Sequence, residues 1–346
     1  MSHKRSSRAI HGVLVVDKPR GPTSHDVVAA VRRHFGTRRV GHAGTLDPMA
    51  TGVLVVLLGE ATKLSAHLTR DVKRYVARVS FGAATDTLDA EGRIVRVKTL
   101  EPGWLTKDAL EAALHYELER TLQIPPVVSA IKVAGRSAHE RARRGEEIHL
   151  APREVELHEA TVRAWDDQGL EVELLVSKGY YVRAFARDLG EALGVPAHLA
   201  ALRRTASGPF VDGEALPFPL AENAAPTPLY DVVKRALVTC TLTEEGATRA
   251  KDGKQLRPDD LAEHAFPPQE ALHLEGVTHD SFPPSDSASR PSSETESEGD
   301  DGDDVPSGAL LACLYGARVV ALATQLPDGN LKVVRGIHDP GAEPSA

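Results

Sequence analysis

GHAGTLDPMATG, residues 41–52, places the carboxylate of Asp47 in a segment too rich in Gly, Pro and Thr for ordinary helix or strand. Apolar runs typical of strands lie on both sides, at residues 12–16 and 53–58. A loop anchored by core strands can hold a catalytic side chain at a defined angle. Taken alone, Asp47-Pro48 is more typical of a turn or a helix start than of a catalytic site, so the other motifs must decide.

Length and composition exclude several classes. The 346 residues favour two domains, and a hydrophobic content of 41% suffices for buried cores. No apolar run reaches the roughly 18 residues of a transmembrane helix, and no signal-peptide apolar region follows the basic N-terminus. Cys240 and Cys313 lie in apolar surroundings typical of buried thiols. We therefore expect a cytoplasmic protein that does not enter a membrane.

Charge is distributed unevenly along the chain. The formal net charge is -8, but residues 1–236 carry 33 Lys and Arg against 29 Asp and Glu, whereas residues 237–346 carry 8 against 20. Residues 1–80 are the most basic, with 14 cations against 5 acids. A basic N-terminal third suits a polyanion such as nucleic acid. Ordinary surface solvation explains the charge alone equally well.

The hydrophobic pattern mixes strands and helices without a regular βαβ repeat or a Gly-rich phosphate-binding motif. This pattern favours an α+β domain with a large mixed or antiparallel sheet. Ser24 is predicted to cap the first helix, and Thr106 to begin another. The expected strands are residues 11–16, 53–58, 74–81, 155–163, 170–177 and 236–241, and the expected helices are residues 24–35, 60–69, 106–120, 137–144, 183–193 and 197–203.

Composition changes in the C-terminal third. Residues 280–307 have almost no apolar side chains and many Ser, Asp and Glu, which predicts a disordered acidic insertion. Short apolar strands are expected at 309–315 and 318–324, and Asp328-Gly329 predicts a hairpin before 331–335. Residues 237–275 and 308–338 together therefore indicate one small β-rich domain.

Four further segments carry reactive or cationic side chains: DKPRGPTS (17–24), KRY (73–75), SKGYYVRAFARDLG (177–190) and LRRT (202–205). With Asp47 they supply one carboxylate, two phenols, an arginine suited to pairing a carboxylate and several phosphate-seeking cations. The sequence contains no His-rich metal cluster and no Ser-His-Asp order, so we expect no metal site. A lone carboxylate with aromatics indicates a planar, stackable substrate such as a nucleobase, although each tyrosine or arginine alone is more typical of a structural position.

Five blocks, GVLVVDKP, GHAGTLDPMATG, KRY, SKGYYVR and LRRT, resemble in order and approximate spacing the motifs of the TruB-type tRNA pseudouridine synthases. The resemblance covers residues 9–215. It implies a pseudouridine-synthase-like fold and an enzyme that isomerises a T-loop uridine of tRNA to pseudouridine without a cofactor. It also implies that the T-arm of tRNA is the partner, that no other protein is obligatory and that the enzyme is a monomer.

The resemblance assigns roles position by position. Asp47 matches the catalytic aspartate, and Arg183 matches the arginine that pairs with it. Tyr75 matches the tyrosine that stacks on the extruded base. Tyr181 matches a second active-site tyrosine, a candidate for the final proton transfer, and Leu202 matches an apolar contact to the uracil.

Two more positions are matched outside this group. Lys18, with Pro19, matches a structural turn near the pocket, and His42 matches a residue that enters the RNA loop in place of flipped bases. By charge alone, Arg183 should keep Asp47 ionised and lower its pKa. The residues leave three actions open for Asp47: attack on the sugar, attack on the base, or assistance in removing a proton.

Residues 122–150 are predicted to form an RNA-contacting loop region that departs from the family pattern. Val128 stands where the family has Tyr, and His139 replaces an aromatic residue. The predicted organisation is a flexible basic N-terminus (1–10), a catalytic domain (11–236) and a terminal domain (237–346) that resembles the small β-rich PUA RNA-binding module. The acidic insertion 280–307 interrupts that terminal domain.

Three alternatives keep the same residues but change the function. The first is a non-catalytic RNA-binding module, which the set of Asp47, Tyr75, Tyr181 and Arg183 disfavours. The second is an aspartate-dependent hydrolase of small nucleosides, which the basic N-terminal third disfavours. The third is a guide-RNA-dependent member of the same family, which activity without partner proteins would exclude.

Overall fold

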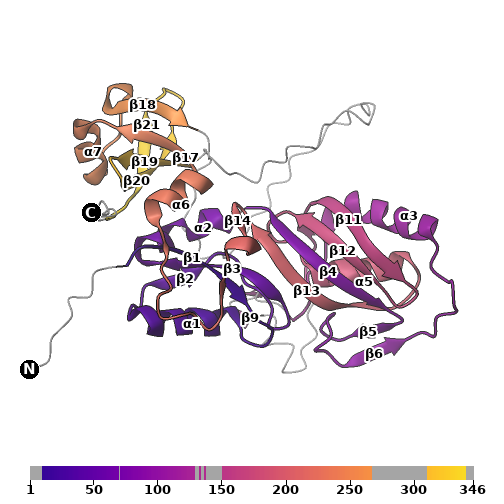
Figure 1. The fold of residues 1–346 in the computed structure, drawn as a ribbon. Coiled ribbons are helices and arrows are strands. Elements are labelled where there is room, and N and C mark those ends of the chain that lie inside the picture. Colours follow the sequence, from indigo (N-terminus) through magenta and orange to yellow (C-terminus); the bar gives the residue numbers. More distant parts are fainter. Residues whose placement is uncertain are drawn as a thin grey trace, which may run out of the picture.

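The computed structural model describes residues 10–69, 71–128, 132–133, 136–137, 150–266 and 310–339. They form one large sheet with flanking helices and a small β-rich C-terminal unit (Figure 1). The predictions for residues 1–9, 138–144 and 280–307, and for His139, lie outside the described residues. None of the helices in the described part of the chain is long and apolar enough to span a bilayer.

The large sheet has ten strands in the order β11-β12-β4-β13-β3-β1-β15, with β14, β16 and β2 paired to β13, β1 and β3. β13 runs parallel to β3 and β1 parallel to β15, whereas β4 is antiparallel to both of its neighbours. The predicted mixed sheet is therefore confirmed. Its strands are β1 (Gly12–Lys18), β2 (Val40–His42), β3 (Thr51–Leu58), β4 (Lys73–Phe81), β11 (Leu157–Asp166), β12 (Gly169–Val176), β13 (Ala197–Ser207), β14 (Phe210–Val211), β15 (Leu216–Pro217) and β16 (Thr227–Pro228).

Helices and small sheets surround this framework. The helices are α1 (Ser24–Phe35), η1 (Gly59–Leu64), α2 (Ser65–Leu68), α3 (Lys107–Leu118), α5 (Val182–Ala192), η2 (Asp212–Glu214) and α6 (Leu229–Ala236). Two-stranded sheets pair β5 (Ala83–Thr85) with β6 (Ile94–Val97), β7 (Leu122–Gln123) with β10 (Arg153–Glu154), and β8 (Lys132–Val133) with β9 (Arg136–Ser137).

The central strands β1 and β3 are buried on both faces, which explains their continuous apolar runs. Leu14 and Val16 of β1 belong to the buried cluster that includes residues of α1 and α5. Val13 and Val15, which alternate with them, belong to a second cluster that includes residues of α6 and of the C-terminal strands. The loop between β2 and β3, which carries Asp47, is thus attached to the best-packed part of the sheet.

One predicted helix, 197–203, is wrong: these residues belong to strand β13. β13 pairs with β4 through a register shift between Leu199 and Ala201. The extra residue at such a bulge puts Leu199 and Leu202, three positions apart, both in the buried cluster. Apolar residues three apart are the spacing of a helix, so the bulge gave this strand a helical pattern.

Two local predictions at helix ends also need correction. Thr23, not Ser24, caps α1: its hydroxyl accepts from the backbone N–H of Asp26, and the Asp26 carboxylate accepts from that of Thr23. Ser24 is instead buried against the Asp47 loop. The predicted helix 60–69 is the 3-10 helix η1 followed by the single turn α2. Thr106 caps α3 as predicted.

The C-terminal unit is β-rich, as predicted. Its sheet has the order β18-β17-β19-β20-β21, and Cys240 of β17 faces Cys313 of β19 in a buried core. Figure 1 shows α6 between this unit and the large sheet. Its elements are β17 (Val238–Leu242), α7 (Glu244–Lys251), η3 (Pro258–Asp260), β18 (Leu261–Phe266), β19 (Leu310–Tyr315), β20 (Arg318–Gln325) and β21 (Leu331–Gly336).

A buried carboxylate, Glu60 of η1, joins the two units. It accepts from Lys63 Nζ at 2.7 Å and from the backbone N–H of His338 at 3.0 Å, and it also pairs with Arg39. Lys63 donates in turn to the carbonyl of Gly336 at 2.6 Å. Burial opposes the charge of Glu60, but these hydrogen bonds and cations lower its pKa from 4.5 to about 2.

Glu60→Gln is expected to lower the free energy of unfolding at neutral pH by about 2 kcal/mol, because buried donors lose a charged acceptor. The depressed pKa places the stabilising effect above pH 4.5 and removes it as pH falls toward 2. Denaturant unfolding of both proteins measures the difference, which should shrink across that window. Exposed Glu222→Gln is the control, and a Glu60→Gln protein as stable as the native chain at neutral pH would contradict the prediction.

Candidate active site

A pocket of about 320 Å³ lies where the Asp47 loop meets β4, β13 and the turn from β12 into α5. Its volume is within the range of small-ligand sites. Five of the predicted site residues line it, and Lys18 and His42 do not. These five lining residues are Asp47, Tyr75, Tyr181, Arg183 and Leu202, and the cations Lys73, Lys178 and Arg204 line it with them.

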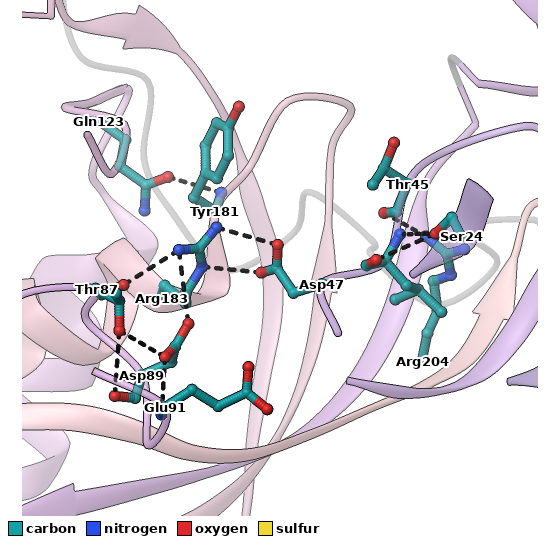
Figure 2. Close-up of polar contacts among 11 residues, drawn as sticks. Ser24, Thr45, Asp47, Thr87, Asp89, Glu91, Gln123, Tyr181, Arg183 and Arg204 are labelled. Carbon is teal, nitrogen blue, oxygen red and sulfur yellow. Dashed lines mark hydrogen bonds and ion pairs between the residues drawn. The ribbon is translucent and has the colours of Figure 1, made fainter. Parts of the chain in front are cut away.

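Asp47 and Arg183 form a two-pronged ion pair at the wall of the pocket. Nη2 of Arg183 donates to Oδ1 of Asp47 at 3.1 Å, and Nε lies 2.8 Å from Oδ2 (Figure 2). The side chain of Arg183 is 6% exposed and that of Asp47 33% exposed. The arginine is therefore part of the protein interior, and the carboxylate is presented to the pocket.

The far side of Arg183 is fixed by the turn after β5. Nη1 donates to the carbonyl of Thr87 at 3.1 Å and lies 3.6 Å from Oδ2 of Asp89. Asp89 is itself held by the hydroxyl of Thr87 at 2.6 Å and the N–H of Glu91 at 3.0 Å. Figure 2 shows this chain of contacts from Asp89 through Arg183 to Asp47. The guanidinium is thus clamped between two carboxylates.

The predicted direction of the Asp47 pKa shift is wrong. Burial raises the pKa of the Asp47 carboxyl above its ordinary value of 3.8, and the charge and hydrogen bond of Arg183 oppose this without reversing it. The like charge of Asp89 adds to the increase. The opposite charge of Arg183 can be inferred from residue types, but the burial of Asp47 arises only in the folded chain.

The remaining pocket residues come from neighbouring strands. Tyr75 of β4 and Leu202 of β13 are each only 8% exposed. They lie on paired strands, with Tyr75 opposite Arg204 and Leu202 opposite Ala77. Tyr181 precedes α5, and its backbone N–H donates to Oε1 of buried Gln123 at 2.8 Å. Two strands and one helix start therefore place apolar and aromatic groups around Asp47.

Lys18 and His42, which do not line the pocket, have other surroundings. Lys18 is fully buried, donates to the carbonyls of Pro19 and Pro48, and has its pKa lowered by burial to about 8. His42 stands at the end of β2, 5.5 Å from the ring of His25 in an edge-on contact. Burial, with nearby His25 and Arg204, lowers the pKa of His42 to about 4, so the imidazole is neutral at physiological pH.

Sequence reasoning did not select Thr87, Asp89 or Gln123 for the site, nor Ser24 or Arg204 as supports of its loop. TDTLDAEG, residues 85–92, has the same signal as the Asp47 loop, because polar residues and a glycine follow an apolar strand. Its turn contains Leu88 with a left-handed φ of 65°. Within the described ranges, no three His, Cys, Asp or Glu side chains gather as a metal site would require.

Comparison with known proteins places this geometry in a family. Residues 32–182 match the model of the TruB family pseudouridylate synthase N-terminal domain, and residues 183–220 match that of the tRNA pseudouridylate synthase B C-terminal domain. The tRNA pseudouridine synthase B of Corynebacterium aurimucosum is 45% identical over 257 residues, covering 72% of this chain and 86% of the relative. That of Thermobifida fusca is 45% identical over 256 residues, with 71% and 87% covered.

The chain belongs to the TruB family of pseudouridylate synthases. Its predicted class as an isomerase is thereby confirmed. The fold of this TruB family member is similar to a chain in the structure of an H/ACA ribonucleoprotein bound to a substrate RNA containing 2'-deoxyuridine. The TM-score is 0.62 at 19% identity, with 94% of this chain and 85% of the other covered. That similarity confirms the fold class.

Proposed function

We propose that this TruB family chain converts a uridine in the T loop of tRNA to pseudouridine and that Asp47 is its catalytic residue. One observation carries the proposal. Among the described residues that line the pocket, Asp47 is the sole carboxylate, and it shares the pocket with Tyr75, Tyr181 and Leu202. The name of the relatives, tRNA pseudouridine synthase B, supports tRNA as the substrate.

The isomerisation breaks the bond from N1 to C1′, turns the base and joins C5 to C1′. The hydrogen of C5 leaves as a proton, and N1 gains one. Departure of the base leaves positive charge on the sugar, which an oriented carboxylate beside it stabilises. Arg183 holds Asp47 in place for this task. Tyr181, from the same helix start as Arg183, is the candidate for moving the proton.

The substrate base must leave its stack to enter the pocket. Flipping costs a few kcal/mol, and stacking on an aromatic ring returns about 1–3 kcal/mol. Tyr75 is the proposed stacking partner, and Leu202 the apolar contact on the neighbouring strand. Exposed Lys178, in the same pocket lining, suits a phosphate that flanks the base, whereas buried Lys73 donates to the carbonyls of Thr69 and Asp71.

The proposal extends to the rest of the chain. The basic N-terminal third favours contact with tRNA, and the β-rich C-terminal unit is proposed as a second, PUA-like RNA contact. The enzyme is proposed to act in the cytoplasm as a monomer, without cofactor, metal or protein partner.

A site-mapping experiment tests this function. An unmodified tRNA transcript is incubated with the purified chain, and pseudouridine is located by mass spectrometry of the digested RNA. We expect product in the T loop alone, formed without a guide RNA and also in an isolated T arm. Replacing the T-loop uridine with cytidine should abolish product but preserve binding. Product elsewhere in the tRNA would contradict the proposed site.

In a plot of reaction rate against pH, the fall in rate on the acid side (the acid limb) is expected to follow the Asp47 pKa, because the ionised carboxylate is the active form. Burial raises that pKa, so activity should begin to fall above the pH of an ordinary carboxyl group. Asp89→Asn removes a like charge and should move the limb to lower pH. Single-turnover rates at saturating enzyme measure the shift.

Asp86→Asn is the matched control for this pH prediction. Asp86 lies in the same turn but pairs with the exposed Arg93. The acid limb of Asp86→Asn should lie at the same pH as that of the native chain. A limb that moves to higher pH in Asp89→Asn would contradict the assignment of the titrating group to Asp47.

A further inference from the structure

Every backbone carbonyl of the Asp47 loop from residue 44 to residue 48 accepts a hydrogen bond. The carbonyls of Gly44 and Thr45 accept from Arg204, that of Leu46 from Ser24, and that of Asp47 from the N–H of Ala50. The carbonyl of Pro48 accepts from the N–H of Gly21 at 2.9 Å and from Lys18 at 3.2 Å. Loops of this kind usually leave several such groups to solvent.

Ser24 bonds to Leu46 in both directions. The N–H of Leu46 donates to Oγ of Ser24 at 2.9 Å, and Oγ of Ser24 donates to the carbonyl of Leu46 at 3.1 Å. Ser24 is 1% exposed, and it begins helix α1. One hydroxyl thus satisfies both the backbone N–H and the carbonyl of Leu46, the residue directly before Asp47.

Arg204 holds the other end of the loop from strand β13. It is 1% exposed, and its guanidinium donates to Val53 at 2.7 Å, Gly44 at 3.0 Å and Thr45 at 3.5 Å, all through backbone carbonyls. Gly44 has φ of 95°, and a Cβ there would lie 3.5 Å from Nη1 of Arg204. Although Arg204 lines the pocket, its donors are directed into the loop.

We infer that Ser24 and Arg204 are positioning residues, which hold the backbone around Asp47 so that its carboxylate stays in register with Arg183. The inference rests on the proposed function in one respect, that Asp47 acts at the substrate. A carboxylate on an unrestrained loop would sample many orientations, and a displacement of about 1 Å at a reacting group can cost a factor of about 100 in rate.

Ser24→Ala tests the inference, because it removes both bonds to Leu46 with the smallest change in volume. We expect the single-turnover rate on tRNA to fall about 10- to 100-fold while the dissociation constant for tRNA stays the same. Arg204→Lys keeps the charge but gathers its donors on one nitrogen, without the planar fork whose three nitrogens reach the three carbonyls, and it should also lower the rate. Ser24→Ala remains decisive if the Arg204 variant fails to fold.

Thr23→Ala is the matched control. It removes the exposed cap of the same helix and leaves Leu46 untouched, so it should lower the melting temperature without lowering the rate. A rate loss in both variants would assign the effect of Ser24 to helix stability and overturn the inference.

Hydrogen exchange of the Leu46 amide gives a readout that does not depend on activity. Ser24→Ala should speed exchange in a peptide covering residues 43–49, and Thr23→Ala should not. Unchanged exchange in Ser24→Ala, or faster exchange with a native rate, would overturn the inference. A native chain inactive on tRNA, with a protected Leu46 amide, would instead refute the proposed function.

Discussion

Asp47→Asn is expected to reduce the single-turnover rate of pseudouridine formation by at least about 1,000-fold. Asparagine keeps the shape of the side chain but not its charge. The pocket would then hold cations and aromatic rings without a carboxylate among its described lining residues. Because Arg183 lies mostly in the interior, the substitution should leave the pocket shape intact. The measurement is rapid-quench analysis of tRNA under excess enzyme.

Binding separates a catalytic role from a structural one in this variant. Asp47→Asn should bind tRNA with the native dissociation constant or slightly tighter, since a negative charge near phosphates is removed. Asp166→Asn is the control. Asp166 accepts hydrogen bonds from backbone N–H groups in the turn between β11 and β12, at the end of β12 opposite to the pocket. Asp166→Asn should keep the native rate. Full activity in Asp47→Asn would refute the catalytic assignment.

Arg183→Met is expected to lower the same rate about 100-fold, because Asp47 loses both its orientation and its ion pair. Removing a cation that lowers the Asp47 pKa should also move the acid limb to higher pH, opposite to Asp89→Asn. Arg183→Lys keeps the charge but not the two-pronged geometry, so its single-turnover rate should lie between those of the native chain and Arg183→Met.

The control for Arg183 lies one turn along the same helix. Arg187 pairs with Asp188 at 2.7 Å and does not line the pocket. Arg187→Met should therefore keep the native rate and pH profile. Equal losses in the two methionine variants would indicate damage to α5 rather than to the Asp47 pair. An Arg183→Met protein with an unmoved acid limb would contradict the electrostatic part of the account.

Much of the fold was predictable because its central strands are buried on both faces and so have unbroken apolar runs. The β13 strand was missed because a bulge gave Leu199 and Leu202 a helical spacing. In the site, Asp47 and Tyr181 were singled out because their sequence blocks resemble the family motifs, whereas each residue alone is more typical of a structural position. Asp89 was missed because it acts through Arg183.

Ser24 and Arg204 show a different limit of sequence reasoning. Both form hydrogen bonds with backbone groups of the loop. The residue types in the loop do not indicate which side chains will bind its backbone N–H and C=O groups. Ser24 was predicted as a helix cap, since Ser at a helix start has that preference. The Asp47 pKa had the same limit, because burial is a property of the folded chain.

Tritium release from C5 of uridine in an unmodified tRNA transcript tests the central claim most directly. The purified chain is used alone, beside Asp47→Asn, without cofactor or guide RNA. The account predicts stoichiometric release by the native chain and none by the variant, with tRNA bound by both. Tight binding without release by the native chain would contradict the account and leave a protein that only binds RNA.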